Sequence, residues 1–255
     1  MRRTGQRSTA SLTDARSVQY VLVRKKPNVY VQPSTFGILA VASPARAMIG
    51  WATLSISSAG LTTMAGSLAD GSAMSQSVSV SKDGRWPSHA AYAAPPASNG
   101  GAVFGWLSFS NQPATGLGGT LYWFRPAGNA CAMYQSGFTN LAIAVIGSAY
   151  NPNEKPRLAL TDGQGQVSLD GANLPFAIQN QCTLTPENTI IVAPPDTDKP
   201  ALTISKSTGA ITGSFANPLN AKQSTKITGV LLQNKTSAAG YFLGTNRGGA
   251  FLLNP

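Results

Sequence analysis

The sequence has few charged side chains, because Asp, Glu, Lys and Arg together make up 11% of its 255 residues. An average soluble domain has about 25%. One histidine and two cysteines are present, so the usual zinc ligand sets are excluded. No apolar run reaches the roughly 18 residues that span a bilayer, so no membrane span is expected. Glycine and proline are plentiful, with 26 and 17 residues, and this composition favours strands and turns over helices.

The formal charge of +10 is unevenly distributed along the chain. Residues 1–46 hold eight basic side chains against the single acid Asp14, whereas the other 209 residues hold eleven basic and eight acidic side chains. A nucleic-acid surface would interleave basic and aromatic residues on one face. The sequence therefore predicts a basic N-terminal arm on a nearly neutral body, with no nucleic-acid partner.

Apolar and polar residues alternate over short segments throughout the chain, which is the period of half-buried strands. Glycine or asparagine interrupts these segments, and about a dozen strands are expected. Residues 139–150 fit a helix or a buried strand equally well, because they contain β-branched residues and Gly147. The fold class predicted is all-β, as an antiparallel barrel or sandwich.

One sequence pattern, which we call the doubled phrase, occurs twice in the chain, as TLSISSAGLTTMAGSLADG (53–71) and ALTISKSTGAITGSFANP (201–218). In both, an alternating strand reaches a glycine-containing turn and returns, which predicts a β-hairpin. A third, looser copy is read over residues 158–171. The chain is thus divided into a basic leader with a first strand (1–47), a first β half (48–126), an irregular connection (127–154) and a related second β half (155–255). The glycine-rich segment 244–251 is expected to form the last hairpin turn, with Arg247 exposed.

Several motifs resemble those of a known type of module: GWATLSISSAGLTTMAGSLADGS, VSKDGRWP, GWLSF, LYWFRPAG and the closing TKITGVLLQNKTSAAGYFLGTNRGGAFLLNP. Residues 48–255 are similar in these motifs to a β-rich module found near the C-termini of large bacterial secreted or cell-surface proteins. The resemblance implies an extracytoplasmic location and a barrel or sandwich fold. It supplies no active site that can be transferred to this chain.

His89 is the only histidine, so it would be the base of any serine hydrolase site in this chain. Asp83 and Asp70 are candidates to orient it, or to act as paired carboxylates on a glycoside, and Ser81 or Ser136 are candidate nucleophiles. The alternative is a loop histidine that caps a turn.

Aspartates in turns are candidate calcium ligands, because Ca²⁺ prefers carboxylate and carbonyl oxygens on loops. Asp162 and Asp170, in TDGQGQVSLDG, are the closest to a calcium loop. Asp-Gly is also common in hairpin turns, so plain turns are the alternative, and the expected cofactor is none or calcium. Cys131 and Cys182 either form one disulfide or remain two buried thiols.

Aromatic residues in the first half form a candidate ligand surface, because outward-facing rings on a sheet stack on sugars. The aromatic group of this half is Trp86, Trp106, Tyr122, Trp123 and Tyr134, and the residues chosen as ligand-binding candidates are Trp86, Trp106, Trp123 and Tyr134. The alternative is that GWLSF and LYWF are core strands. The leading functional prediction is therefore an extracytoplasmic structural or adhesion module that binds carbohydrate weakly. The alternative is a hydrolase of a small ester, lactone or glycoside that depends on calcium or on His89.

Overall fold

A computed structural model describes residues 34–42, 48–92, 100–110, 116–128, 132–194 and 198–255. Within these ranges the protein contains sixteen strands, two short 3₁₀ turns and no α-helix. The all-β prediction is confirmed, although the strands number sixteen rather than about a dozen. No helix in the described part of the chain is long and apolar enough to cross a bilayer.

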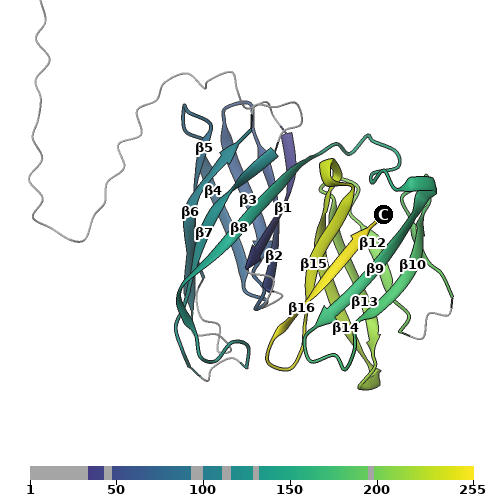
Figure 1. The fold of residues 1–255 in the computed structure, drawn as a ribbon. Helices are drawn as coiled ribbons and strands as arrows, with labels where there is room; N and C mark the ends of the chain where they lie inside the picture. Colours follow the sequence, from purple (N-terminus) through teal and green to yellow (C-terminus); the bar gives the residue numbers. More distant parts are fainter. Residues whose placement is uncertain (1–33, 43–47, 93–99, 111–115, 129–131, 195–197) are drawn as a thin grey trace, which may run out of the picture.

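The first eight strands form one antiparallel sheet that curls into a barrel (Figure 1). Each strand lies beside its neighbours in the chain, and the first strand pairs with the eighth, from Thr35–Tyr150 to Val41–Ala144. The strands are β1 (Ser34–Ala42), β2 (Met48–Ile56), β3 (Leu61–Ser67), β4 (Ala73–Ser79), β5 (Arg85–Tyr92), β6 (Gly101–Phe109), β7 (Gly116–Arg125) and β8 (Phe138–Tyr150).

The other eight strands repeat this architecture in a second barrel, in which β9 pairs with β16. The strands are β9 (Gln164–Gly171), β10 (Ile178–Leu184), β11 (Ile190–Val192), β12 (Ala201–Ile204), β13 (Ala210–Asn217), β14 (Asn220–Leu232), β15 (Ser237–Leu243) and β16 (Gly248–Asn254). The turn between β15 and β16 lies where the last hairpin turn was expected, and Arg247 is exposed there. The chain is therefore built from two related up-and-down barrels.

Each barrel has one seam without a backbone ladder, and the two seams lie at different places. The first sheet ends at β4 and β5, whereas the second ends at β11 and β12. At the first seam the side-chain amide of Gln76 replaces the ladder. Its Nε2 donates to Pro87 O, and its Oε1 accepts from His89 N, both at 2.9 Å. The Gln76 side chain thus accepts from and donates to the backbone of β5, as the backbone of a paired strand would.

The doubled phrase forms two hairpins with similar turns. Gly60 and Gly209 have φ of 76° and 72°, and each donates its backbone N–H to a serine carbonyl, of Ser57 and Ser205 respectively. The second turn is one residue longer. The first hairpin is β2–β3, the second and third strands of its barrel, whereas the second is β12–β13, the fourth and fifth strands. The hairpins therefore match locally without occupying equivalent places.

The third, looser copy does not form a hairpin. Leu158 and Leu160 lie outside any strand and are buried in the core of the second barrel. Residues 164–171 form β9, which pairs with β10 and β16 instead. The alternating pattern predicted β9 correctly, but the strand that it predicted over residues 158–161 is not formed.

The first barrel extends beyond the first β half expected from the sequence. β1 precedes it, and β8 lies in the stretch read as an irregular connection. Residues 139–150 are thus a strand rather than a helix. β8 ends at Tyr150, whose ring already packs in the core of the second barrel and whose hydroxyl donates to Lys206 O at 2.9 Å.

The barrels pack against each other through β1, β2 and β8 on one side and β14, β15 and β16 on the other (Figure 1). Outward-facing apolar residues form a separate cluster there: Leu39, Trp51, Val230, Leu232, Ala239, Tyr241 and Ala250. A Cβ on Gly37 would lie 2.7 Å from Val230 Cγ2, so glycine permits the close approach of β1 and β14. The apolar cluster and this close approach hold the two barrels together.

Candidate functional site

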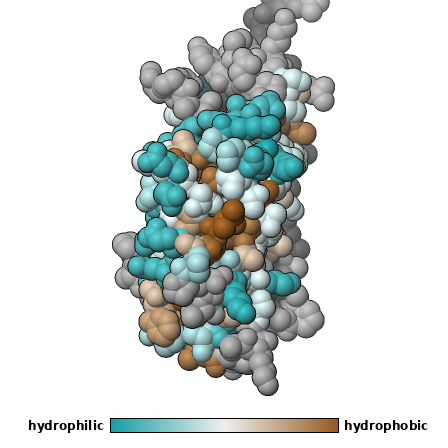
Figure 2. Space-filling model, turned by 90° about the vertical axis from the view of Figure 1, so that its right-hand side faces the viewer, coloured by the Kyte–Doolittle hydropathy of each residue, from teal (hydrophilic) through white to brown (hydrophobic). Residues whose placement is uncertain are grey.

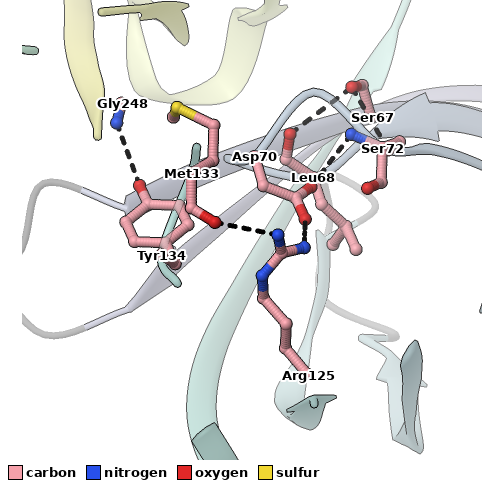
Figure 3. A network of polar contacts seen from close by, with 8 residues as sticks. All are labelled: Ser67, Leu68, Asp70, Ser72, Arg125, Met133, Tyr134 and Gly248. Carbon is pink, nitrogen blue, oxygen red and sulfur yellow. Dashed lines mark hydrogen bonds and ion pairs between the residues drawn. The ribbon is translucent and has the colours of Figure 1, made fainter. Parts of the chain in front are cut away.

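Asp70, a candidate catalytic acid, lies in the turn between β3 and β4 at one end of the first barrel (Figure 3). Its carboxylate forms an ion pair with the Arg125 guanidinium, and both side chains are fully buried. The other carboxylate oxygen accepts from Ser72 N at 2.9 Å. Arg125 Nη2 donates to Met133 O at 2.8 Å, so the pair also holds the loop between β7 and β8. The surrounding contacts give Asp70 a structural role.

The loop between β7 and β8 also contacts the second barrel. Tyr134 follows Met133, and its hydroxyl accepts from Gly248 N at 3.1 Å, at the start of β16 (Figure 3). Burial raises the pKa of the Tyr134 hydroxyl above its ordinary value, although the Gly248 hydrogen bond acts in the opposite direction. A second contact between the barrels joins the hydroxyls of Ser67 and Tyr241 at 2.5 Å, and burial raises the pKa of Tyr241 too.

The candidate catalytic residues are not brought together. Asp70 and Asp83 lie in turns at opposite ends of β4, whose seven residues at about 3.3 Å each separate the turns by about 20 Å. His89 is exposed on the outside of β5, whereas Asp70 is buried at the barrel end. Ser81 lies in the same turn as Asp83, where its hydroxyl accepts from Arg85 N at 3.1 Å. Ser136 lies in the loop after β7, at the other end of the barrel. These positions do not form the converging arrangement that nucleophilic catalysis requires.

The two candidate calcium ligands are also far apart. Asp162 immediately precedes β9 and Asp170 lies near its other end, so about eight residues at 3.3 Å separate them by roughly 25 Å. Asp162 lines a surface hollow of about 370 Å³ with Thr161, Gln164, Gly165, Gln166, Gln181 and Pro255. No group of three acidic, histidine or cysteine side chains is close enough to hold a metal within the described ranges.

Cys182 is a free thiol buried in the core of the second barrel, and its burial raises the pKa of the thiol. Cys131 lies outside the described residues. Of the two readings of the cysteines, the structure therefore supports a buried thiol at Cys182.

The candidate aromatic residues divide between the inside and the outside of the first barrel. Trp86 and Trp123 are buried among the core side chains of the first barrel. Tyr134 packs edge-on against Trp123, with ring centroids 6.3 Å apart. Trp106, by contrast, is 49% exposed on the outer face. Core packing therefore explains two of the tryptophans, and Trp106 remains available to a ligand.

Trp106 belongs to a group of four exposed rings on the paired strands β6 and β7, which we call the aromatic strip. Its members are Phe104 (44% exposed), Trp106 (49%), Tyr122 (39%) and Phe124 (39%). Figure 1 shows β6 and β7 on the side of the first barrel that is turned away from the second. The strip is therefore not covered by the interface between the barrels.

Strand register determines the shape of the aromatic strip. Phe104 and Tyr122 are directly opposite each other, with ring centroids 6.2 Å apart and planes tilted by 36°. Trp106 is two residues along β6 in one direction, and Phe124 is two residues along β7 in the other. Because two residues span about 6.6 Å of strand, the four rings extend over about 13 Å. The strip is long enough to contact more than one ring of an extended ligand.

The sequence interpretation missed Phe104 and Phe124. Phe104 lies two residues from Trp106, and Phe124 lies two residues from Tyr122. Their neighbours Val103 and Trp123 point inward. Strict two-residue alternation was the signal for an outward pair. It was hard to use because the inward and outward residues of these strands are both apolar.

Among its described residues, the second barrel has no comparable strip. Its exposed large hydrophobic residues come from separate turns and strands: Phe176, Ile191, Leu219, Leu243 and Leu252. Figure 2 shows its side turned away from the first barrel, where hydrophilic residues surround a hydrophobic area. The grouping of aromatic rings distinguishes the first barrel.

Comparison with known proteins finds no family model, no curated protein and no solved structure that matches this chain.

Proposed function

We propose that the protein is an extracytoplasmic structural or adhesion module that binds carbohydrate through the aromatic strip. The observation that carries the proposal is the exposure of four rings on one strand pair of a barrel whose interior is already filled. Contiguous exposed apolar patches on soluble proteins mark interaction sites, and aromatic faces stack on the apolar faces of sugar rings.

The joined barrels support the structural part of this proposal. Apolar packing, the Tyr134–Gly248 hydrogen bond and the Ser67–Tyr241 contact connect them at several points. Such a connection presents the strip on a firm support rather than on a separate, tethered domain. The resemblance to modules of bacterial surface proteins agrees with an extracytoplasmic location.

A hydrolase is less well supported. The acid, base and nucleophile candidates are distributed over both ends and the outer face of the first barrel. The Asp70 carboxylate already forms an ion pair with the Arg125 guanidinium.

The proposal is tested by measuring binding of the full chain to immobilised polysaccharides of several classes. Variants Trp106→Ala and Tyr122→Ala are compared with Leu61→Ala, which removes an exposed apolar side chain on β3. We expect the strip variants to lose at least about tenfold in affinity, since one stacked aromatic ring contributes about 1–3 kcal/mol. Leu61→Ala should bind as the unmodified protein does. Equal binding by all four proteins, or no binding to any polysaccharide, would refute the proposal.

A further inference from the structure

The outer face around the aromatic strip carries positive charge and no acidic side chain. Alternate residues of β5, β6, β7 and β8 point outward there. None of these outward-facing residues is Asp or Glu. Arg85 and His89 are the basic members of this set, and both are exposed. A negatively charged ligand would therefore meet no carboxylate on this face.

Arg85 is placed directly at the strip. Its guanidinium carbon lies 5.0 Å from the centre of the Trp106 ring, which is the geometry of a cation–π contact. Asp83 lies in the adjoining turn, and no ion pair joins it to Arg85 in the part of the chain that the structure describes. The guanidinium is thus held over an aromatic ring with its hydrogen-bond donors available to a ligand.

His89 is aligned with the middle of the strip. Strand register places it opposite Phe104, which is itself opposite Tyr122, so the three side chains form a row across β5, β6 and β7. The exposed imidazole provides a second hydrogen-bonding group beside the rings. Stacking surfaces and polar donors therefore occur side by side on one face.

Resting on the proposed function, we infer that the ligand of the aromatic strip is an acidic polysaccharide whose sugar rings carry carboxylate groups. The sugar rings stack on the strip, Arg85 pairs with a carboxylate, and His89 donates a further hydrogen bond. A guanidinium fits a carboxylate with two parallel hydrogen bonds, which makes this group the natural partner for Arg85.

Single-stranded nucleic acid also stacks on aromatic residues, but the charges on this face suit it less well. Such sites follow the phosphate backbone with a groove of several Lys and Arg side chains. Here a single arginine, Arg85, lies beside an aromatic strip about 13 Å long. A glycan that carries carboxylates on only some of its rings needs fewer positive charges per stacked ring than a nucleic acid, which carries one phosphate per nucleotide. It therefore fits a strip with one arginine better.

The test uses the full chain and two probes, polygalacturonate and its fully methyl-esterified form, in which each carboxylate is replaced by an uncharged ester. Affinities are measured by calorimetry for the unmodified protein and for Arg85→Gln, Arg85→Lys and Trp106→Ala. The matched control is Lys206→Gln, which removes an exposed charge from the turn between β12 and β13 of the second barrel. The basic leader is present in every protein, so its attraction to polygalacturonate cancels when the variants are compared on that one probe. The difference between the two probes also contains the leader's attraction to the polyanion, so the Arg85 variants decide the inference.

We expect Arg85→Gln to weaken binding of polygalacturonate by at least about tenfold, consistent with loss of a charged hydrogen bond. Esterification of the probe should weaken binding to the unmodified protein by at least as much. Arg85→Gln should not weaken binding of the ester, Arg85→Lys should retain part of the preference, and Lys206→Gln should have no effect. If both probes bind equally and Trp106→Ala abolishes binding, the inference fails while the proposed function stands. If neither probe nor any other polysaccharide binds, the proposed function itself fails. Tighter binding of oligo(dT) that is lost in both Trp106→Ala and Arg85→Gln would overturn the inference in favour of nucleic acid.

Discussion

The Asp70 carboxylate is ion-paired with the Arg125 guanidinium inside the first barrel, although 55 residues separate them in the sequence. The pair connects the β3–β4 turn to the end of β7 and, through Met133 O, to the loop that carries Tyr134. Both side chains are buried, so each charge is compensated by the other rather than by water.

Breaking this pair is expected to destabilise the protein strongly. Asp70→Asn leaves the Arg125 charge buried without a counter-charge, so the free energy of unfolding should fall by about 3–5 kcal/mol. Urea denaturation monitored by tryptophan fluorescence measures this loss. Asp83→Asn, in the exposed turn at the other end of β4, is the matched control and should change it by less than about 0.5 kcal/mol. A small loss for Asp70→Asn would show that the pair is not essential.

The Gln76 side chain is expected to hold the first seam closed. Gln76→Ala removes the hydrogen bonds to Pro87 O and His89 N, and should lower the free energy of unfolding by about 1–3 kcal/mol. Hydrogen exchange at the His89 amide should accelerate, while exchange in the second barrel stays unchanged. Ser75→Ala, on the exposed face of β4, should alter neither measurement. Unchanged exchange at His89 would show that the seam closes by other means.

Two glycines at matching places in the doubled phrase are expected to resist substitution. A Cβ on Gly66 would lie 2.5 Å from Ala52 Cα, and one on Gly213 would lie 2.7 Å from Leu202 Cδ2. Gly66→Ala should therefore lower the free energy of unfolding by about 1–3 kcal/mol or more, because backbone atoms must move to make room for the methyl group. Gly213→Ala should also destabilise. Gly118→Ala is the control, because its Cβ meets its nearest neighbour at 3.6 Å. Equal melting temperatures for Gly66→Ala and Gly118→Ala would contradict the steric explanation.

Tyr134 and Tyr241 are expected to make stability fall in alkaline solution. Their pKa values are raised above 10.0 in the folded protein, chiefly by burial. The protonated hydroxyl is therefore favoured in the folded state, so its contribution is complete below pH 10 and is lost as the pH rises through the folded pKa. Denaturation midpoints between pH 8 and pH 11 measure the loss.

The matched variants for this pH effect are tyrosine-to-phenylalanine changes. Tyr241→Phe should reduce the alkaline loss, whereas Tyr122→Phe, on the outer face, should leave it unchanged. Identical pH profiles for the two variants would mean that buried tyrosines do not cause the loss.

Local patterns in the sequence were enough to predict the all-β class and the paired hairpins, although they indicated about a dozen strands rather than sixteen. Two-residue alternation identified β2, β3, β12 and β13, because each has one face in a core. The same pattern failed for residues 158–160. Leu158 and Leu160 are buried without belonging to a strand, and burial alone produces the same spacing of apolar residues.

The site depended on information that local patterns do not contain. Arg125 was not predicted to be buried, because its partner is distant in the sequence and a charge near a strand end usually faces solvent. Trp86, Trp106 and Trp123 look alike in the sequence, yet only Trp106 faces outward. With apolar residues on both faces of β6, the direction of each ring was settled only by how the barrel closes.

The pairing of the first strand with the last in each barrel has a consequence for how such chains grow. In both barrels the chain enters and leaves at the same rim, on adjacent strands. A complete barrel can therefore be inserted or duplicated as one genetic unit without disturbing the strand order of its neighbours. Proteins of this architecture can therefore change length by whole barrels while each existing sheet keeps its strand pairing.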